Sequence, residues 1–190
     1  MDRSPEDRPM TRFGYVMATY LAVLGVAVAA VIPTPTKLVW NVTASAPIGL
    51  YTIARADRIT VPELVAVMPP EPLATFMVER GYIGRGVPLL KRVAGLPGQR
   101  VCRNRSVITV DGVEMGEALE RDQIGRALPV WRGCRVIASD ELFLMNGHVR
   151  DSLDGRYFGP VSANTVMGRA LPLWTDEDGD GRFVWRAATR

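Results

Sequence analysis

The side chain of this chain best suited to acid–base chemistry is Lys91, which lies in the largely apolar stretch LLKRVAGLPG at residues 89–98. The cationic residues are almost all arginine, and Lys37 is the only other lysine. Lysine can lose its proton when it is removed from water, whereas arginine keeps its charge. A neutral amine is a base, and Ser45 upstream offers a hydroxyl that a base could activate for attack on a carbonyl. We therefore interpret Ser45 and Lys91 as a candidate catalytic dyad.

The apolar neighbours of Lys91 provide the physical means to neutralise it. A lysine at its ordinary pKa of about 10.4 is protonated at neutral pH and cannot act as a base. Lowering that pKa to near 7 costs roughly 4–5 kcal/mol, and burial among apolar side chains could supply this by desolvation. The sequence therefore predicts a buried Lys91, and the alternative is an exposed lysine on a strand.

A third segment, residues 146–160, is unusually polar for a stretch that directly follows an apolar run. Asp154 and Arg156 are spaced so that they could pair and brace a loop. Ser152 could hydrogen-bond the lysine amine and orient it. These three side chains are therefore candidates for supporting the dyad.

Together the three segments resemble the type I signal peptidase family of serine–lysine peptidases, and most closely its conjugative-transfer branch, the TraF-type peptidases. The lysine segment follows the family pattern Lys-Arg-Val-x-Gly-x-Pro-Gly at residues 91–98. The serine segment carries the Pro-x-Gly-x-Tyr of the TraF branch at Pro47, Gly49 and Tyr51. The polar loop matches the family at Ser152, Asp154, Arg156 and Gly159.

Two positions depart from the family pattern. Gly155 stands where the family usually has serine, and Asn146-Gly147 stands where signal peptidases often carry Gly-Asp-Asn. These departures count against broad processing of signal peptides and favour the TraF branch.

The resemblance implies both a mechanism and a fold. Ser45 would be the nucleophile, Lys91 would be the general base, and the Thr43 hydroxyl together with the Ser45 backbone N–H would bind the oxyanion. The family fold is a mostly β catalytic domain, and the family needs no metal and no cofactor. The remaining site residues would act in support, namely Ser152, Asp154 and Arg156.

Two other interpretations of the polar residues have to be weighed. A Ser-His-Asp triad would require His148, the only histidine, to reach Ser45. The acidic run at residues 176–181 resembles the first half of a calcium-binding loop, but its twelfth position is Ala187, where a bidentate glutamate is needed. We expect His148 to be a loop residue near the site and the acidic run to be a hairpin turn.

The N-terminal part of the chain predicts a membrane anchor. Residues 13–32 carry no charge, and 20 residues in a helix span about 30 Å, the thickness of a bilayer core. Arginines precede this run, so we expect residues 1–12 to be cytoplasmic and residues 33–190 to form a periplasmic peptidase domain at the inner membrane of a bacterium. The alternative is a cleaved secretory signal, for which the small residues 27–29 offer a cutting site.

Composition limits the remaining classes of protein. The net charge is +3 without a basic run, so we expect no nucleic-acid partner. A single histidine and the absence of a C-x-x-C make a zinc site improbable. In an oxidising periplasm Cys102 and Cys134 could form a disulfide worth roughly 3–4 kcal/mol, and the alternative is two unrelated buried thiols.

Short apolar runs with Gly and Pro punctuation predict a mostly β domain. We expect residues 33–42 to be a link and residues 101–113 to be a hairpin that turns at Asp111-Gly112. A short helix is expected at residues 73–80, ended by Gly81. The other expected strands lie at 48–53, 64–68, 87–93, 142–145 and within 161–173.

The function that follows from these observations is that of a membrane-anchored serine endopeptidase. The resemblance implies processing of an exported precursor during conjugative plasmid transfer, a pilin in particular, by trimming or by cyclisation. The expected partners are a polypeptide substrate, the lipid bilayer and a conjugative secretion apparatus. The alternatives are a general type I signal peptidase for secretory preproteins and a non-catalytic periplasmic assembly factor.

Overall fold

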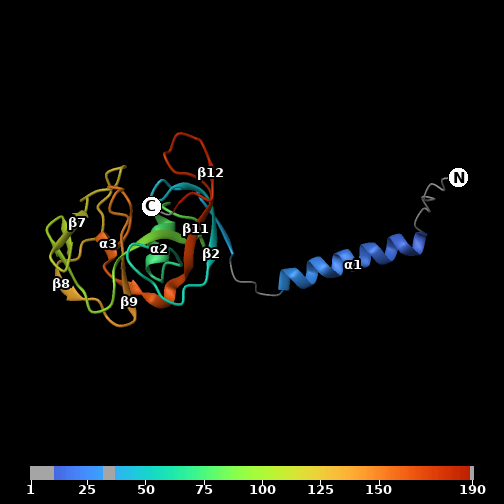
Figure 1. The fold of residues 1–190 in the computed structure, drawn as a ribbon, viewed down its shortest axis with the longest axis horizontal. Helices are drawn as coiled ribbons and strands as arrows, with labels where there is room; N and C mark the ends of the chain where they lie inside the picture. Colours follow the sequence, from blue (N-terminus) through green and yellow to red (C-terminus); the bar gives the residue numbers. More distant parts are fainter. Residues whose placement is uncertain (1–10, 32–36, 189–190) are drawn as a thin grey trace. The chain divides into compact units, whose positions relative to one another are not determined.

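The computed structural model describes residues 11–31 and 37–188 (Figure 1). The chain divides into two units, Met1–Pro35 and Thr36–Arg190, which are considered separately below.

The first unit contains one helix, α1 (Arg12–Val31), of 20 residues. It covers nearly all of the predicted apolar segment, and its apolar side chains are exposed, Phe13 at 73% and Val26 at 71%. None of the helices in the described part of the chain has both the length and the hydropathy needed for a membrane crossing. Arg3 and Arg8, on which the predicted orientation depends, lie outside the described residues.

The larger sheet of the second unit has the strand order β1-β2-β11-β3-β4-β9-β10, with β12 paired to β11. All of these pairs are antiparallel. The strands are β1 (Leu38–Asn41), β2 (Ile48–Ala54), β3 (Leu64–Val67), β4 (Leu89–Gly95), β9 (Glu141–Leu144), β10 (Val161–Ser162), β11 (Val166–Asp176) and β12 (Val184–Trp185).

Both faces of this sheet are covered at its centre. Successive residues of a strand point to opposite faces, and all four residues of β3 are buried. Leu64 and Ala66 pack with Tyr51 and Leu90 in one apolar cluster. Val65 and Val67 belong to the opposite cluster, which includes residues of β4 and β9. Lys91, on β4, is the cross-strand partner of Val65 on β3. The lysine therefore lies beside a strand whose four residues are all buried.

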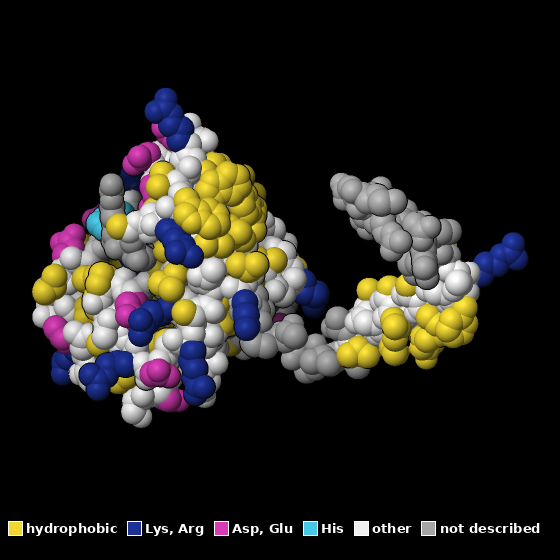
Figure 2. All heavy atoms as spheres, turned by 45° about the vertical axis from the view of Figure 1, so that its right-hand side comes forward, with side chains coloured by type: hydrophobic (Ala, Val, Ile, Leu, Met, Phe, Trp, Pro, Cys, Tyr) yellow, Lys and Arg dark blue, Asp and Glu magenta, His cyan; other side chains and the backbone are white. Residues whose placement is uncertain are grey.

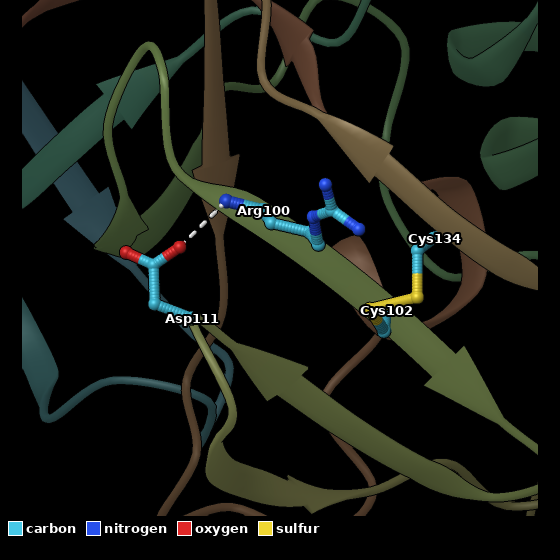
Figure 3. Close-up of a disulfide and its surroundings, with 4 residues drawn as sticks. All are labelled: Arg100, Cys102, Asp111 and Cys134. Carbon is cyan, nitrogen blue, oxygen red and sulfur yellow. Dashed lines mark hydrogen bonds between the residues drawn. A yellow bond between two sulfur atoms is a disulfide. The ribbon is translucent and has the colours of Figure 1, made fainter.

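The smaller sheet has the order β7-β6-β5-β8 and is formed by β5 (Arg100–Asn104), β6 (Val107–Val110), β7 (Val113–Glu117) and β8 (Gly133–Val136). Asp111 and Gly112 both have positive φ, 49° and 82°, as a two-residue turn of type I′ requires. The Asp111 carboxylate also accepts a hydrogen bond from the Arg100 backbone N–H at 2.8 Å (Figure 3). This bond fixes the turn against the start of β5.

Cys102 and Cys134 form a disulfide between neighbouring strands of the smaller sheet (Figure 3). The two residues are direct cross-strand partners of β5 and β8. The covalent link therefore ties β8 to the meander of β5, β6 and β7.

Short helices complete the domain. α2 (Leu73–Glu79) follows the proline-rich segment, and Met77 buries its side chain. α3 (Gly155–Phe158) lies within the polar loop, and the 3-10 helix η1 (Ala163–Thr165) precedes β11. An apolar cluster joins Tyr157 to Ala118 and Leu128, so the polar loop is anchored on the segment between β7 and β8 of the smaller sheet.

The structure confirms the mostly β prediction and corrects it in four places, the first of which is β8 (Gly133–Val136), where no strand was expected. The expected link at 33–42 contains β1, because residues 38–41 complete the edge of the sheet beside β2. The expected hairpin at 101–113 is a three-strand meander, since a second turn at Arg105-Ser106 precedes the one at Asp111-Gly112. The polar loop, for which no helix was expected, contains α3 because the Asp154 side chain caps it.

The disulfide generates a stability prediction. The double change Cys102→Ser/Cys134→Ser should lower the free energy of unfolding by about 2–4 kcal/mol, because it releases a long closed loop in the unfolded chain. Urea denaturation of the full chain measures this. The wild type in the presence of a reductant should lose the same amount, and a loss confined to one of the two samples would contradict this explanation.

Candidate active site

Ser45 lies in the loop between β1 and β2, and the side chain of Asn41 organises this loop from within. The buried Asn41 amide donates to the carbonyls of Thr43 at 2.8 Å, Ala46 at 3.0 Å and Pro47 at 3.0 Å. Its oxygen accepts from the Thr43 hydroxyl at 3.0 Å. The Thr43 hydroxyl also lies 3.2 Å from the Ser45 hydroxyl, which is half-buried. The loop therefore presents two adjacent hydroxyl groups, and the Asn41 side chain fixes its backbone.

The Pro-x-Gly-x-Tyr segment fixes the chain that follows Ser45 and lets β2 pack closely on β11. The Tyr51 hydroxyl donates to the Pro47 carbonyl at 2.7 Å, and Tyr51 is fully buried. Gly49 has a φ of +143°, and a Cβ there would lie 2.3 Å from the carbonyl oxygen of Trp174 on β11. Glycine is thus required for β2 to approach β11, and tyrosine pins the segment that follows Ser45.

Lys91 is buried, with 4% of its side chain exposed. Its Nζ donates to the Ser152 hydroxyl at 2.8 Å. Burial lowers the pKa of the Lys91 amine to about 8, although the carboxylates of Asp154 and Asp151 favour the charged form. The nearby Arg156 adds to the effect of burial. A group with this pKa can act as a base near neutral pH.

Ser45, Lys91 and Ser152 line one cavity of about 280 Å³. Within the described part of the chain, no direct hydrogen bond joins the Ser45 hydroxyl to Lys91. In enzymes without substrate such bonds are often longer and tighten when substrate binds. The two predicted partners therefore line one pocket, in which a carbonyl could approach the hydroxyl.

Asp154 and Arg156 form a buried ion pair, with side chains at most 1% exposed. Two guanidinium nitrogens donate to the two carboxylate oxygens at 2.9 and 2.8 Å. Arg156 also donates to the carbonyls of Val149 at 2.7 Å and Ser152 at 3.0 Å. The pair therefore shapes the loop that presents Ser152 to the lysine amine.

Gly155, which departs from the family pattern, is explained by its surroundings. A Cβ at this position would lie 2.6 Å from the Phe143 ring and 2.7 Å from the Leu144 carbonyl oxygen. The loop in this chain packs directly on β9, and a serine in this place would push it away.

The alternative site residues lie near Ser45 but form neither a triad nor a calcium loop in the described part of the chain. His148 is exposed and lines a second cavity of about 510 Å³, which also reaches Ser45. In the part of the chain described here, it forms no hydrogen bond to Ser45 or to a carboxylate. The Asp176 carboxylate accepts the backbone N–H groups of Asp180 at 3.2 Å and Gly181 at 2.9 Å, so the acidic run forms the turn between β11 and β12.

Two asparagines at the site were not expected from the sequence. Asn41 holds the serine loop as described above, and Asn146 donates to the Ser45 carbonyl at 2.6 Å. Asn146 was interpreted as a departure from the signal peptidase pattern. Its position directly after a buried strand was the available signal, since a buried amide needs several partners.

The buried ion pair generates a prediction. Arg156→Ala should lower the free energy of unfolding by about 3–5 kcal/mol, because it leaves the Asp154 carboxylate buried and unpaired. Chemical denaturation measures this change. Arg182→Ala is the matched control, because Arg182 is 89% exposed and lies 3.7 Å from Asp180; it should leave the unfolding midpoint unchanged. Equal losses in the two variants would contradict the role given to burial.

Comparison with known proteins gives a consistent result. The profile described as "Signal peptidase, peptidase S26" matches residues 10–174. The chain is 36% identical over 146 residues to a conjugal transfer protein TraF of Agrobacterium fabrum (strain C58 / ATCC 33970), covering 71% of this chain and 81% of the relative. It is 30% identical over 146 residues to a plasmid transfer protein TraF of Escherichia coli, with the same coverage.

A solved structure of a signal peptidase I from Enterococcus faecalis V583 superposes with a TM-score of 0.33 at 21% identity, covering 59% of this chain and 98% of the other. The assignment rests on the sequence comparisons. The match to the profile extends over most of the chain and includes the serine, lysine and polar segments. The chain therefore belongs to the signal peptidase family, peptidase S26.

Proposed function

We propose that this protein is a serine endopeptidase with a Ser45–Lys91 dyad that processes an exported precursor in conjugative plasmid transfer. The observation that carries the proposal is the shared cavity, in which a half-buried hydroxyl and a buried amine with a pKa of about 8 lie together. The names of the TraF relatives support the conjugative context.

The proposed reaction begins with neutral Lys91, which takes the proton of the Ser45 hydroxyl. The Ser45 oxygen attacks the scissile carbonyl. The Ser45 backbone N–H stabilises the oxyanion that develops, together with the Thr43 hydroxyl, whose hydrogen turns from Asn41 Oδ1 toward the new charge. Protonated Lys91 then gives its proton to the leaving amine, and an ester joins the substrate to Ser45. Water releases the product, or the substrate's own amino terminus attacks the ester and gives a circular product. Ser152 orients the Lys91 amine throughout.

The substrate would be an exported polypeptide, in particular a pilin precursor. Cavities of about 280 and 510 Å³ both reach Ser45, so a chain lying across the hydroxyl finds space in two directions. The resemblance implies small residues at the cleavage site. The two alternatives are a general signal peptidase, which would accept many secretory preproteins, and a non-catalytic assembly factor, which would need neither Ser45 nor Lys91.

The proposed location is the periplasmic side of a bacterial inner membrane. Residues 13–32 are the proposed anchor, although α1 as described does not meet the length and hydropathy of a crossing helix. The exposed apolar side chains along α1 support an apolar environment for this helix. The disulfide between Cys102 and Cys134 supports an oxidising compartment for the β domain. Contact with a conjugative secretion apparatus belongs to the same proposal.

An exposed aromatic patch on the β domain also supports a membrane-side location. The patch consists of Trp40, Trp174, Phe183 and Trp185, contributed by β1, β11, the segment before β12, and β12. The ring centroids of Trp174 and Phe183 are 4.8 Å apart, and those of Trp40 and Phe183 are 6.1 Å apart. The three tryptophans are 43–62% exposed, and apolar side chains gather visibly on this domain (Figure 2). Tryptophan favours the boundary between water and lipid.

Removal of the dyad tests the proposed activity. Ser45→Ala and Lys91→Ala should each lower the rate of processing of a conjugative pilin precursor by about 10³-fold or more, because neither partner works alone. Lys37→Ala is the matched control, since Lys37 is the other lysine and is exposed; it should process at the wild-type rate. Gel or mass analysis of the precursor measures this.

Two outcomes would reject parts of the proposal. Processing that persists in Ser45→Ala would favour the non-catalytic assembly factor. Cleavage of many secretory preproteins by the wild type, at rates equal to that of the pilin precursor, would favour the general signal peptidase.

The lowered pKa of Lys91 gives a pH prediction. With a pKa of about 8, roughly a tenth of the amine is neutral at pH 7 and roughly nine-tenths at pH 9. Because the neutral form is the base, kcat/KM should rise about tenfold per pH unit below 8 and level off above it. A profile from pH 5 to 10 with a peptide substrate measures this. A rise centred well below 7 or near 10.5 would contradict the assignment of Lys91 as a buried base.

A further inference from the structure

Asn146 occupies a central position between the three segments of the site. It follows β9 directly, and only 4% of it is exposed. A buried side-chain amide that lacks partners is costly, so its hydrogen bonds reveal what it holds together.

The Asn146 side chain connects the serine loop to the lysine strand. Its Nδ2 donates to the Ser45 carbonyl at 2.6 Å and to the Leu90 carbonyl at 3.1 Å. Its Oδ1 accepts the Arg92 backbone N–H at 2.9 Å. Leu90 and Arg92 are the two neighbours of Lys91. One amide group therefore hydrogen-bonds the backbone on both sides of the lysine and also the backbone carbonyl of Ser45.

The Asn146 backbone extends the connection to the third segment. Its N–H donates to Asp154 Oδ2 at 3.1 Å, the carboxylate oxygen that also accepts from Arg156. Asn146 is therefore bonded to the serine loop, the lysine strand and the buried ion pair at once.

Two asparagines divide the carbonyl groups of the serine loop between them. Asn41 takes the carbonyls of Thr43, Ala46 and Pro47, which belong to its own loop. The Ser45 carbonyl is held by Asn146, a residue 101 positions away in the chain. Asn41 thus gives the loop its shape, and Asn146 connects it to the lysine strand.

We propose that Asn146 is a positioning residue that sets the separation between the Ser45 hydroxyl and the Lys91 amine. This inference rests on the proposed dyad. Asn146 has no role in contacting substrate, because both amide hydrogens and one side of the oxygen are already used within the protein. It acts through the backbone of Ser45, and a displacement of about 1 Å at such a site can cost about 10²-fold in rate.

The kinetic test compares Asn146→Ala and Asn146→Asp with the wild type, as full chains, on a quenched-fluorescent peptide with alanine before the scissile bond. Both variants should lower kcat about 10–100-fold and leave KM within about threefold, because the bond serves the reacting geometry and not substrate binding. Asn146→Asp keeps the size of the side chain but removes both donors, so it should be impaired although it creates no cavity. An Asn146→Asp variant with wild-type kcat would overturn the inference.

A second measurement does not depend on activity. Hydrogen–deuterium exchange in peptides covering residues 43–47 should become at least about tenfold faster in Asn146→Ala, because the loop loses its tether to β4. Exchange in residues 101–110 of the smaller sheet should be unchanged. Unaltered exchange at residues 43–47 would overturn the inference even if the wild type cleaved no peptide.

The double change Cys102→Ser/Cys134→Ser is the control for lost stability. It lowers the stability of the domain away from the site, so its kcat should stay within about twofold of the wild type at a temperature where both are folded. If this control lost as much kcat as Asn146→Ala, instability would account for both and Asn146 would have no positioning role. A wild type that cleaves neither this peptide nor a pilin precursor would reject the proposed function, whereas the exchange experiment would still decide the role of Asn146.

Discussion

The removal of the Lys91 amine from water is the constraint on which the site depends. A lysine on an exposed strand would be almost fully charged at neutral pH, whereas burial lowers the pKa of Lys91 to about 8, so that roughly a tenth of the amine is neutral at pH 7. β4 lies between β3 and β9, and the polar loop closes over the amine through Ser152. The strands and the polar loop that bury the amine also line the pocket that Lys91 shares with Ser45. The lowered pKa of Lys91 and the shape of this pocket therefore depend on the same elements.

The lowered pKa of Lys91 also depends on the pairing of the acidic residue beside it, Asp154, with Arg156. Asp154 favours the protonated amine, and a free carboxylate at this distance would oppose the effect of burial. Arg156 binds both oxygens of that carboxylate and itself disfavours a second positive charge nearby. The ion pair thus organises the loop while the pKa of Lys91 stays below its ordinary value. A buried pair of this kind contributes geometry more than net stability.

The sequence predicted the chemical groups better than it predicted their connections. The central strands and the turn at Asp111-Gly112 were predictable because their patterns are local. β1 was missed because its four residues follow a proline-containing segment and gain their partners only from β2. β8 was missed because all of its residues are exposed, so no apolar alternation marks it. The hydrogen bonds of Asn146 were not predicted because they reach residues far away in the chain, and no local pattern predicts such contacts.

The path of the chain between β4 and β9 has a further consequence. These strands are neighbours, and Gly95 pairs with Phe143, although the residues between them form the smaller sheet. The chain thus leaves the larger sheet and returns to nearly the same point. Such an excursion can gain or lose length at its far turns while the two strands at its base keep their register. The far turns of this excursion are accordingly suitable places to insert a tag or a fluorescent reporter, because added residues there leave the pairing of β4 with β9 in place.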